Sequence, residues 1–589
     1  SEKFQLLRRP YTIDAWDFTS DYDAAITNGD FMDADLEKTT FGVMHGDSTG
    51  MADACRRLAV MLRFVDRGDE ADEADRFADH LLRRVGEVAW NGEFFTHHVS
   101  EDPSFTRDFG VDESAQVSLS NACALNRGIS HEKAVSILKT YQRIRKEMPD
   151  SSGGEFYMIY PPYERGFHIP KWEYANGGVL PLIAGEIAAG ALEHGFEEYG
   201  LDVLDRVVAK TDEADLDMIP WGFRGAVAPE PERTFSSVDL RAVANADITC
   251  EEGQDGFLGV PGLDIRELGS GVFELDRIPY TILDSAGAGA ENPGGACVRL
   301  AYNTPGFADR ARIEIGRKAE SIYFLYTTYG AKGQIGDIDI HYGDGTVARR
   351  SVELGVNIAS FWAPVRPDRQ DRMPCFRTVI SWRGKCPGFW NVGLTSHGLD
   401  NPHPEKEIDF IELISVGEGK KWIVLSMTTS DAPVYFKPDI VGHGVNIARS
   451  AGSLLMALVE GVAGVRDDGA NMSRVRIAPR WAAAGIGRSR VCIAYAEGGG
   501  YTAYSYEQSD EGLTLEIAST GDKRRIELLL PAGREVESIM VSESGDASQA
   551  GLAAESVPFE IVEREESRYA CFESNSLSAV TVVARLQAV

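Results

Sequence analysis

Two short segments of the sequence set a tryptophan directly beside a carboxylate, in loop-like contexts that precede helical stretches. Their polar and aromatic residues are Asp14, Trp16 and Asp17 near the start, and Trp172, Glu173 and Asn176 later in the chain. A sugar site needs an aromatic plate for the apolar face of the ring and a carboxylate for proton transfer or hydroxyl binding. The two segments therefore predict a carbohydrate-active enzyme.

Asp17 is the first candidate for a general acid. Trp16 and Phe18 flank it and could partly desolvate it, and burial raises a carboxyl pKa toward the range that a proton donor needs. The structural alternative is that Asp17 caps the following turn or pairs with an arginine. Asp14, three positions earlier, is either a second site carboxylate or a cap.

A glycosidase also needs a second carboxylate, which the sequence does not single out. Glu173 and Glu186 complete the catalytic candidates, and Glu93 and Glu460 are further options. Glu186 lies in an apolar helical segment, where an acid is either paired or facing a cavity. Inverting enzymes separate the two carboxyl groups by roughly 6.5–9.5 Å, and retaining ones by about 5 Å.

Further polar loops supply candidates for substrate binding. The first is the glycine-bounded loop at His45 and Asp47, which could instead hold the N-cap of the next helix. The second contains Trp90, Glu93 and His97. His98 adjoins His97, and neighbouring side chains in an extended segment face opposite ways, so at most one imidazole should face a site. No partner sits at ligand spacing, so we expect neither a metal nor a cofactor.

Composition restricts the class of partner and compartment. The 589 residues carry 91 acidic and 59 basic side chains, a net charge of −32. This disfavours nucleic acid and anionic membranes, which both require a basic surface. The sequence has no apolar run of about 18 residues, so we expect no transmembrane helix. The eight cysteines form no CxxC pair, which favours a reducing compartment such as the cytoplasm.

Hydrophobic periodicity predicts a multidomain α + β protein. Apolar residues recur at helical spacing through residues 1–240, with aromatic and glycine-rich loops between consecutive helices, which favours an (α/α)-toroid-like helical domain. Residues 241–440 alternate apolar and polar positions in short runs, as in an inserted β-sandwich. Residues 441–470 should return to the toroid as a helix, and residues 471–589 should form a small C-terminal β-sandwich.

The order of these features resembles the six-hairpin glycoside hydrolases with an (α/α)6 barrel, and most of all their trehalase-type and α-glucosidase-type inverting members. Trp16-Asp17-Phe18 resembles the acid motif of that family. The segment Lys171-Trp172-Glu173-Tyr174-Ala175-Asn176-Gly177 resembles its Gln-Trp-Asp-Tyr-Pro-Asn-Gly motif. The resemblance covers residues 10–210 and implies that Asp17 is the acid. It also implies that Glu173, with Trp172 and Asn176, contacts sugar hydroxyls.

The sequence departs from this family in two respects. The acid motif lies near the start instead of mid-barrel, and residues 1–240 supply about half of the helices that a six-hairpin toroid needs. The resemblance therefore leaves open a homo-oligomer or a companion chain that completes the barrel. The strands of the insert resemble galactose-binding-like sandwiches of other glycosidases.

Three other functions are compatible with the same features. A phosphorylase on a similar barrel would need anion donors, which Arg107, Arg165 or His168 could supply. A polysaccharide lyase would use a tyrosine or histidine as base. A non-catalytic carbohydrate-binding protein would need only the sandwich, and two carboxylate-bearing segments argue against it. The expected partner is an oligo- or polysaccharide.

Overall fold

The chain is described from a computed structural model. The structure describes residues 1–10, 40–167, 169–213, 219–249, 257–260, 262–284, 295–330, 332–365, 377–386, 389–436, 440–441, 448–509, 511–543, 554–576 and 579–588. Asp14, Trp16, Asp17 and His168 lie outside these residues. The chain forms two compact units. The main unit comprises Ser1–Ala226 and Gly444–Val589, and the insert unit comprises Val227–His443.

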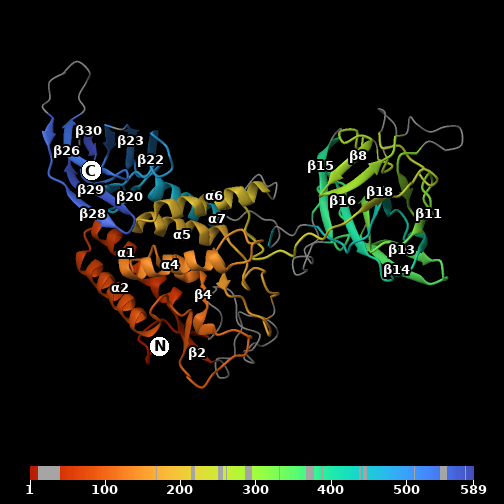
Figure 1. Ribbon diagram of the computed structural model, residues 1–589, viewed down its shortest axis with the longest axis horizontal. Coiled ribbons are helices and arrows are strands. Elements are labelled where there is room, and N and C mark those ends of the chain that lie inside the picture. The colour runs from red at the N-terminus through yellow and green to blue at the C-terminus, as the bar shows by residue number, and fades with distance from the viewer. Residues whose placement is uncertain are drawn as a thin grey trace, which may run out of the picture. The chain divides into compact units, whose positions relative to one another are not determined.

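The protein is a mixed α and β protein, with helices confined to the main unit among the described residues (Figure 1). The helices are α1 (His45–Phe64), α2 (Gly68–Val88), α3 (Leu119–Ala124), α4 (His131–Glu147), α5 (Pro181–His194), α6 (Glu197–Glu213) and α7 (Ala448–Met456), the last continuing as the π-turn Ala457–Val462. Residues 115–126 belong to the region of predicted helical spacing, but only Leu119–Ala124 is helical there, because Val117–Ser118 forms strand β4 and pairs with β5 (Ile159–Tyr160). No described helix is long and apolar enough to cross a membrane.

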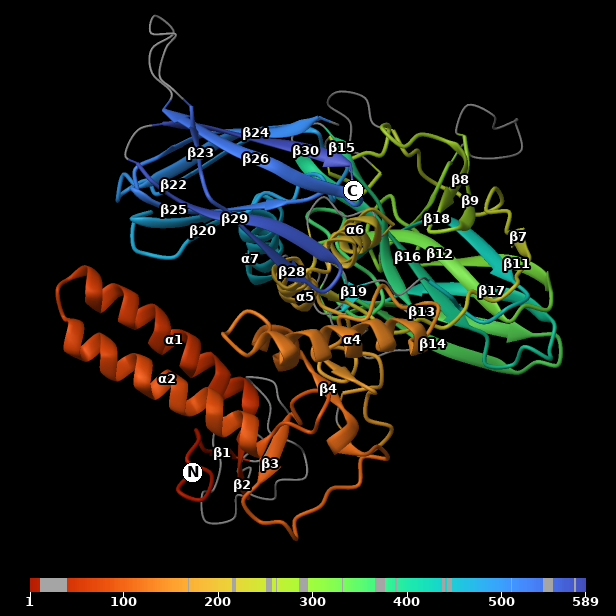
Figure 2. The same ribbon diagram turned by 60° about the vertical axis from the view of Figure 1, so that its left-hand side comes forward.

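Local sequence explains where α5 sits and what it packs against. Pro181 occupies its first turn, where no backbone donor is lost, and Gly195 ends it in a left-handed conformation with φ of 90°. The helix is rich in alanine and glycine and almost wholly buried. A Cβ at Gly185 would lie 2.4 Å from the backbone carbon of Ser453, so only glycine allows α7 to pack this closely. Figures 1 and 2 both show α5 beside α7.

Three short strands bring distant polar loops together in the main unit. β1 (Arg9–Pro10), β2 (Phe41–Met44) and β3 (His98–Ser100) form a sheet in that order, with Met44 opposite His98. β2 runs directly into α1, whose first residue is His45. The β2–β3 pairing therefore places the start of α1 next to the His97–His98 segment. α1 and α2 form an antiparallel pair (Figure 2).

The C-terminal part of the main unit is a sandwich of two sheets around one apolar core. The first sheet has the order β20 (Val465–Asp467), β21 (Arg474–Ile477), β25 (Lys523–Leu529), β29 (Ser567–Asn575) and β28 (Glu560–Arg564). The second has the order β22 (Arg488–Ala494), β23 (Tyr501–Gln508), β24 (Gly512–Ser519), β30 (Val580–Ala588), β26 (Arg534–Glu543) and β27 (Glu555–Ser556).

Buried polar contacts join this sandwich to the helices. The carboxylate of Glu193 accepts two hydrogen bonds of 2.6 Å from Arg476, and Glu197 accepts hydrogen bonds from Ser567 and Tyr569. Arg480, which is fully buried, donates to the Tyr569 hydroxyl at 3.0 Å. A buried ionic group is strongly destabilising when one partner is removed, so these contacts bind the two parts into one folding unit.

The insert unit contains two larger antiparallel sheets around its own core. One has the order β10 (Val298–Leu300), β18 (Lys421–Ser430), β12 (Ser321–Tyr329), β16 (Phe389–Asp400) and β15 (Thr378–Cys386), with β7 (Phe235–Ser237) also paired to β18. The other has the order β11 (Arg310–Arg317), β17 (Ile408–Ser415), β13 (Gln334–Tyr342) and β14 (Val347–Glu353). In this unit β8 (Gly271–Leu275) and β9 (Ile278–Ile282) form a hairpin, and β19 (Ile440–Val441) is a short strand. The short strand β6 (Gly222–Phe223) belongs to the main unit.

Candidate functional site

The loop that carries Trp172 and Glu173 is tight and held by its own backbone. Asn176 donates its backbone N–H to the Glu173 carbonyl at 2.7 Å, and Trp172 donates to the Asn176 carbonyl at 2.7 Å. Trp172 and Tyr174 both adopt positive φ, 70° and 36°, which is uncommon for residues other than glycine. Such conformations persist only where the surroundings impose them, and they cluster at functional sites.

Glycine permits a second segment to pass against this loop. A Cβ on Gly225 would lie 1.8 Å from the carbonyl oxygen of Gly177, so no other residue fits. Gly225 also donates its backbone N–H to the carbonyl of Trp172 at 2.9 Å. This contact brings the preceding residue, Arg224, to the loop.

Glu173 forms an ion pair with Arg224 that is almost completely withdrawn from solvent. The side chains are 4% and 5% exposed, respectively. A carboxylate held by a guanidinium in a buried setting is fixed in position. This geometry suits Glu173 to positioning the loop and its rings better than to acting as a mobile acid or base.

Two pairs of aromatic rings include the loop residues on either side of Glu173, and we call these four residues the aromatic wall: Tyr160, Trp172, Tyr174 and Trp221. The centroid of Trp172 lies 6.4 Å from that of Tyr160, and Tyr174 lies 5.9 Å from Trp221. All four side chains are half-buried, so each ring keeps part of its surface accessible. Such rings present the apolar surface that the face of a sugar ring would cover.

Asn176 serves the loop itself. Its side-chain oxygen accepts from the backbone N–H of Tyr163 at 2.7 Å, and its amide nitrogen donates to the carbonyl of Ile169 at 2.9 Å. The residue is 2% exposed. The side-chain amide of Asn176 is thus bonded to the backbone of Tyr163 and Ile169, which gives Asn176 a structural role in the loop.

A second cluster, which we call the histidine cluster, contains His45, His97, His98, Arg107 and Glu113. The ring centroids of His97 and His98 are only 3.9 Å apart. The expectation that adjacent histidines face opposite ways is therefore wrong here, because β3 begins only at His98 and the backbone before it is not extended strand. His45 stacks on Phe95 with centroids 5.1 Å apart.

Burial sets the charge state of these imidazoles. It lowers the pKa of His45 to about 3, with a smaller contribution from Arg127. Burial, and then Arg107, lower the pKa of His97 to about 3. The nearby side chain of Gln116 opposes this lowering of the His97 pKa without reversing it. Both rings are therefore neutral at physiological pH.

His97, His98 and Glu113 each offer a ligand atom within 4.8 Å of the others, the donor types of a two-histidine, one-glutamate zinc site. The sequence missed this grouping because Glu113 lies outside the expected ligand spacing. Arg107, however, donates to both oxygens of Glu113, at 3.2 and 2.5 Å, and the Tyr163 hydroxyl donates at 3.0 Å. The guanidinium thus supplies the positive charge that this carboxylate requires.

A second set of metal-type donors lies in the insert unit. Asp339 and Glu412 face each other across β13 and β17, and His341 is nearby on the same face. Arg349 donates to both oxygens of Asp339 at 2.7 and 2.6 Å, and Arg310 lies 3.3 Å from Glu412. Both carboxylates are therefore neutralised by arginines, as in the histidine cluster.

The remaining predicted site residues are separated by the fold. Asp47 pairs with Arg9 at 3.3 Å near the start of α1. Trp90 is half-buried and meets Phe95 edge to face at 5.0 Å, beside His45. Glu93 is exposed and pairs with Arg143 at 2.9 Å. Glu93 thus faces solvent, whereas Trp90 belongs with the histidine cluster.

Glu186 lies on α5, away from the aromatic wall in sequence and contacts. Asn126 donates to its carboxylate at 2.7 Å. Burial raises the pKa of Glu186, and this effect outweighs the hydrogen bond and the nearby Arg127. A raised pKa favours the protonated form of a carboxyl group, which is the direction that a general acid requires.

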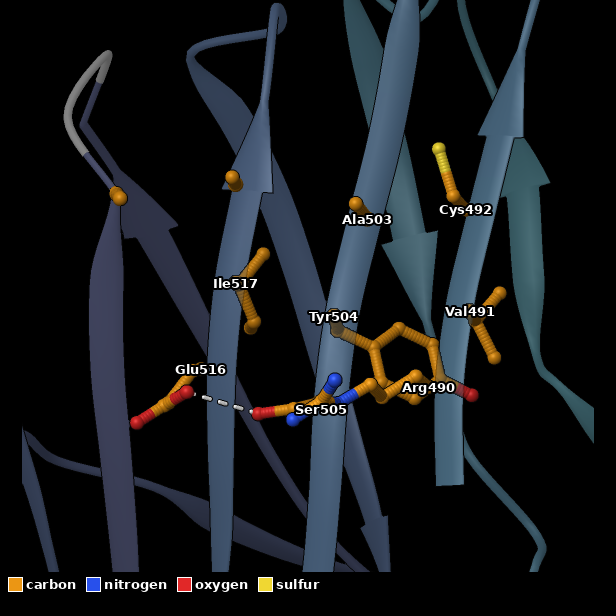
Figure 3. A pocket seen from close by; sticks show the side chains of 10 residues that line it. Arg490, Val491, Cys492, Ala503, Tyr504, Ser505, Glu516 and Ile517 are labelled. Carbon is orange, nitrogen blue, oxygen red and sulfur yellow. Dashed lines mark hydrogen bonds between the residues drawn. The ribbon is translucent and has the colours of Figure 1, made fainter.

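The sandwich carries a wide, shallow cavity of about 600 Å³ across β22, β23 and β24 (Figure 3). Cys492 and Ala503 lie side by side in its floor, and Ser505 donates to Glu516 at 2.9 Å along one side. None of the predicted site residues lines it. Its one carboxylate is already bonded, so it offers no pair of acids for glycoside chemistry.

Comparisons with known proteins find no matching family model and no matching curated protein. Among solved structures, the chain is similar to a GH63 mannosylglycerate hydrolase from Thermus thermophilus, with 14% sequence identity and a TM-score of 0.24. The match covers 32% of this chain and 41% of the hydrolase chain. An uncharacterized conserved protein from the same organism matches with 14% identity, 32% and 42% coverage, and a TM-score of 0.25.

The tandem CBM22 domains of a Paenibacillus barcinonensis protein match with 8% identity, 62% and 92% coverage, and a TM-score of 0.15. This chain spans about two fifths of the length of the first two solved chains that it matches. At these scores, the similarities carry no argument about function.

Proposed function

We propose that the protein is a glycoside hydrolase in which Asp17 is the general acid and the aromatic wall binds the sugar. The observation that carries the proposal is the loop of Trp172 and Glu173, where backbone strain and a buried ion pair fix two aromatic rings. Strained backbone and fixed aromatic surface are what a preorganised sugar site requires. The same proposal includes a toroidal arrangement of the helices and a division of the chain into four domain segments. It also includes membership of a trehalase-like or α-glucosidase-like subfamily.

Glu186 is the candidate second carboxylate of this proposal, and its contact is with Asn126 and not with the aromatic wall. Burial raises its pKa and so favours the protonated form, which suits donation of a proton better than the role of an ionised base. Glu173 is the weaker candidate, because Arg224 occupies its carboxylate.

Hydrolysis is favoured over phosphorolysis by the pairing of the arginines. Arg107 donates to Glu113, and Arg165 pairs with Asp108 at 2.6 Å. Guanidinium groups whose charge is neutralised by a carboxylate are poorer phosphate ligands than unpaired ones.

The test compares wild type with Asp17→Asn and Glu186→Gln in reducing-sugar release from a broad panel of glycans and aryl glycosides. Loss of a general acid or base typically lowers turnover by about 10²–10⁴-fold. Both variants should show this loss while unfolding at an unchanged or higher temperature. Near-normal turnover by a folded Asp17→Asn variant would remove the assignment, and added phosphate would reveal a phosphorylase.

A further inference from the structure

A small cavity of about 200 Å³ lies within the main unit, away from the aromatic wall. It is enclosed by the ends of α3 and α5, the side of α1, the π-turn after α7 and the strands β20 and β21. Its polar lining residues are Arg57, Asn126, Glu193, His194, Glu460, Arg466 and Arg476. None of them belongs to the aromatic wall or the histidine cluster.

The π-turn Ala457–Val462 determines where Glu460 points. Ala463 donates its backbone N–H to the carbonyl of Leu458 at 2.8 Å, the wider spacing that defines such a turn. The backbone N–H of the buried Arg480 donates to the carbonyl of Val462 at 2.8 Å. Its guanidinium donates to the carbonyl of Gly461 at 2.7 Å. π-turns are rare and occur frequently at functional sites.

The positive charges around the cavity are balanced. Three guanidinium groups each pair with a carboxylate: Arg57 with Asp53 at 2.8 Å, Arg466 with Asp468 at 3.1 Å, and Arg476 with Glu193 at 2.6 Å. Burial lowers the pKa of His194 to about 4, so its ring is neutral at physiological pH. The lining therefore gives no net attraction to an anion.

Glu460 is the exception in this balance. Its side chain is half-buried, and within the described part of the chain its carboxylate makes no hydrogen bond or ion pair. Burial raises its pKa despite the charges of Arg466, Arg57 and Arg476. A partly desolvated carboxyl group without a partner gains free energy when a ligand supplies a hydrogen bond.

We propose that this cavity binds one neutral, monosaccharide-sized polyol, with Glu460 as the group that recognises its hydroxyls. A hydroxyl group both donates and accepts, so a polyol can bond to the carboxylate and to the guanidinium N–H groups at once. The cavity is smaller than the roughly 300–1,000 Å³ of sites for drug-sized ligands, which fits a single ring. The cavity adjoins Glu186, because its lining residue Asn126 donates to the Glu186 carboxylate at 2.7 Å, but the proposed binding does not require hydrolysis.

The experiment measures binding of glucose, mannose and galactose to the full chain by ligand-observed NMR titration. At least one sugar should bind saturably, and Glu460→Gln should weaken that binding about tenfold, because a hydrogen bond to a charged group is lost. Glu497→Gln is the matched control, since Glu497 is exposed and does not line the cavity. Thermal unfolding confirms that both variants are folded.

A second variant, Ala189→Met, fills the cavity from α5 without changing charge. It should abolish the Glu460-dependent binding. The absence of saturable binding by any of the three sugars would overturn the proposal, as would unchanged affinity in both Glu460→Gln and Ala189→Met. Binding that is lost only in Trp172→Ala would assign the sugar to the aromatic wall, and this result would also overturn the proposal. Loss of glycan turnover without loss of sugar binding would bear only on the hydrolase proposal.

Discussion

The carboxylate of Glu173 lies against the guanidinium of Arg224, with both side chains at most 5% exposed. Removing one partner of such a pair leaves a buried charge without compensation, whereas removing both costs far less. Arg224→Met should therefore lower the free energy of unfolding by about 3–5 kcal/mol, as measured by urea denaturation.

The double variant Glu173→Leu/Arg224→Met provides the control. It should recover most of the stability lost in Arg224→Met, because no isolated charge remains. If the double variant is as unstable as the single one, packing of the Arg224 stem, and not the ion pair, holds the loop.

Trp172→Ala should raise the KM for the glycan substrate by about tenfold or more, because the loss of a central aromatic contact typically costs over 1 kcal/mol of binding. The ring is half-buried beside Tyr157 and Tyr160. The matched control is Trp390→Ala, because Trp390 lies in the insert unit and is 80% exposed. This substitution should leave KM unchanged. Equal effects of the two substitutions would show that the aromatic wall is not the sugar site.

Stability should fall as the pH falls below about 6.5, the ordinary pKa of histidine. Burial holds the pKa of His45 and His97 near 3 in the folded chain, so between pH 6.5 and about 3 the unfolded chain binds protons that the folded chain does not. Each group then removes about 1.4 kcal/mol of unfolding free energy per pH unit once its unfolded form is protonated.

The matching variant is His97→Gln, compared with wild type by urea denaturation at several pH values between 7 and 5. Its unfolding free energy should depend less steeply on pH than that of wild type. An unchanged slope would mean that His97 is hydrated, and hence protonated, more readily than its burial implies.

The pairing of Arg107 with Glu113 predicts how the histidine cluster responds to zinc. Wild type should gain no thermal stability from added Zn²⁺, because the guanidinium neutralises the carboxylate. Arg107→Ala should expose the two-histidine, one-glutamate set, so its unfolding temperature should rise with Zn²⁺.

Arg107→Ala/Glu113→Gln supplies the control for this effect. The double variant lacks one ligand and should lose the response to Zn²⁺. A wild-type protein that is itself stabilised by Zn²⁺ through these residues would contradict the assigned role of Arg107.

Periodicity alone was sufficient to predict the longer helices and three strands of the insert unit. The helices α1, α2, α4, α5 and α6 lie where apolar residues recur at helical spacing, and β11, β12 and β13 lie where they alternate. These patterns are local, so a single sequence records them. The shortened α3 was missed because pairing between β4 and β5 overrides the helical preference of residues 115–118.

The partners of the candidate residues were harder to predict. Arg224 lies 51 positions from Glu173 and meets it only because Gly225 passes against Gly177. Arg107 is six positions from Glu113, but nothing in an irregular segment indicates which way its side chain points. Asn176 has the residue type of a sugar ligand, and only the structure shows that the loop backbone uses its amide.

The contacts of Glu193 and Glu197 also bear on how the protein is made. Their partners Arg476, Ser567 and Tyr569 lie 283, 370 and 372 positions further along the chain and are therefore translated much later. Until that part emerges, α5 and α6 present acidic groups and apolar surface that nothing yet covers, while the insert unit can already close its own core. The main unit therefore completes its fold only after the segment Gly444–Val589 has been translated, and ribosome-bound chains that stop before residue 444 should recruit chaperones through their N-terminal helices.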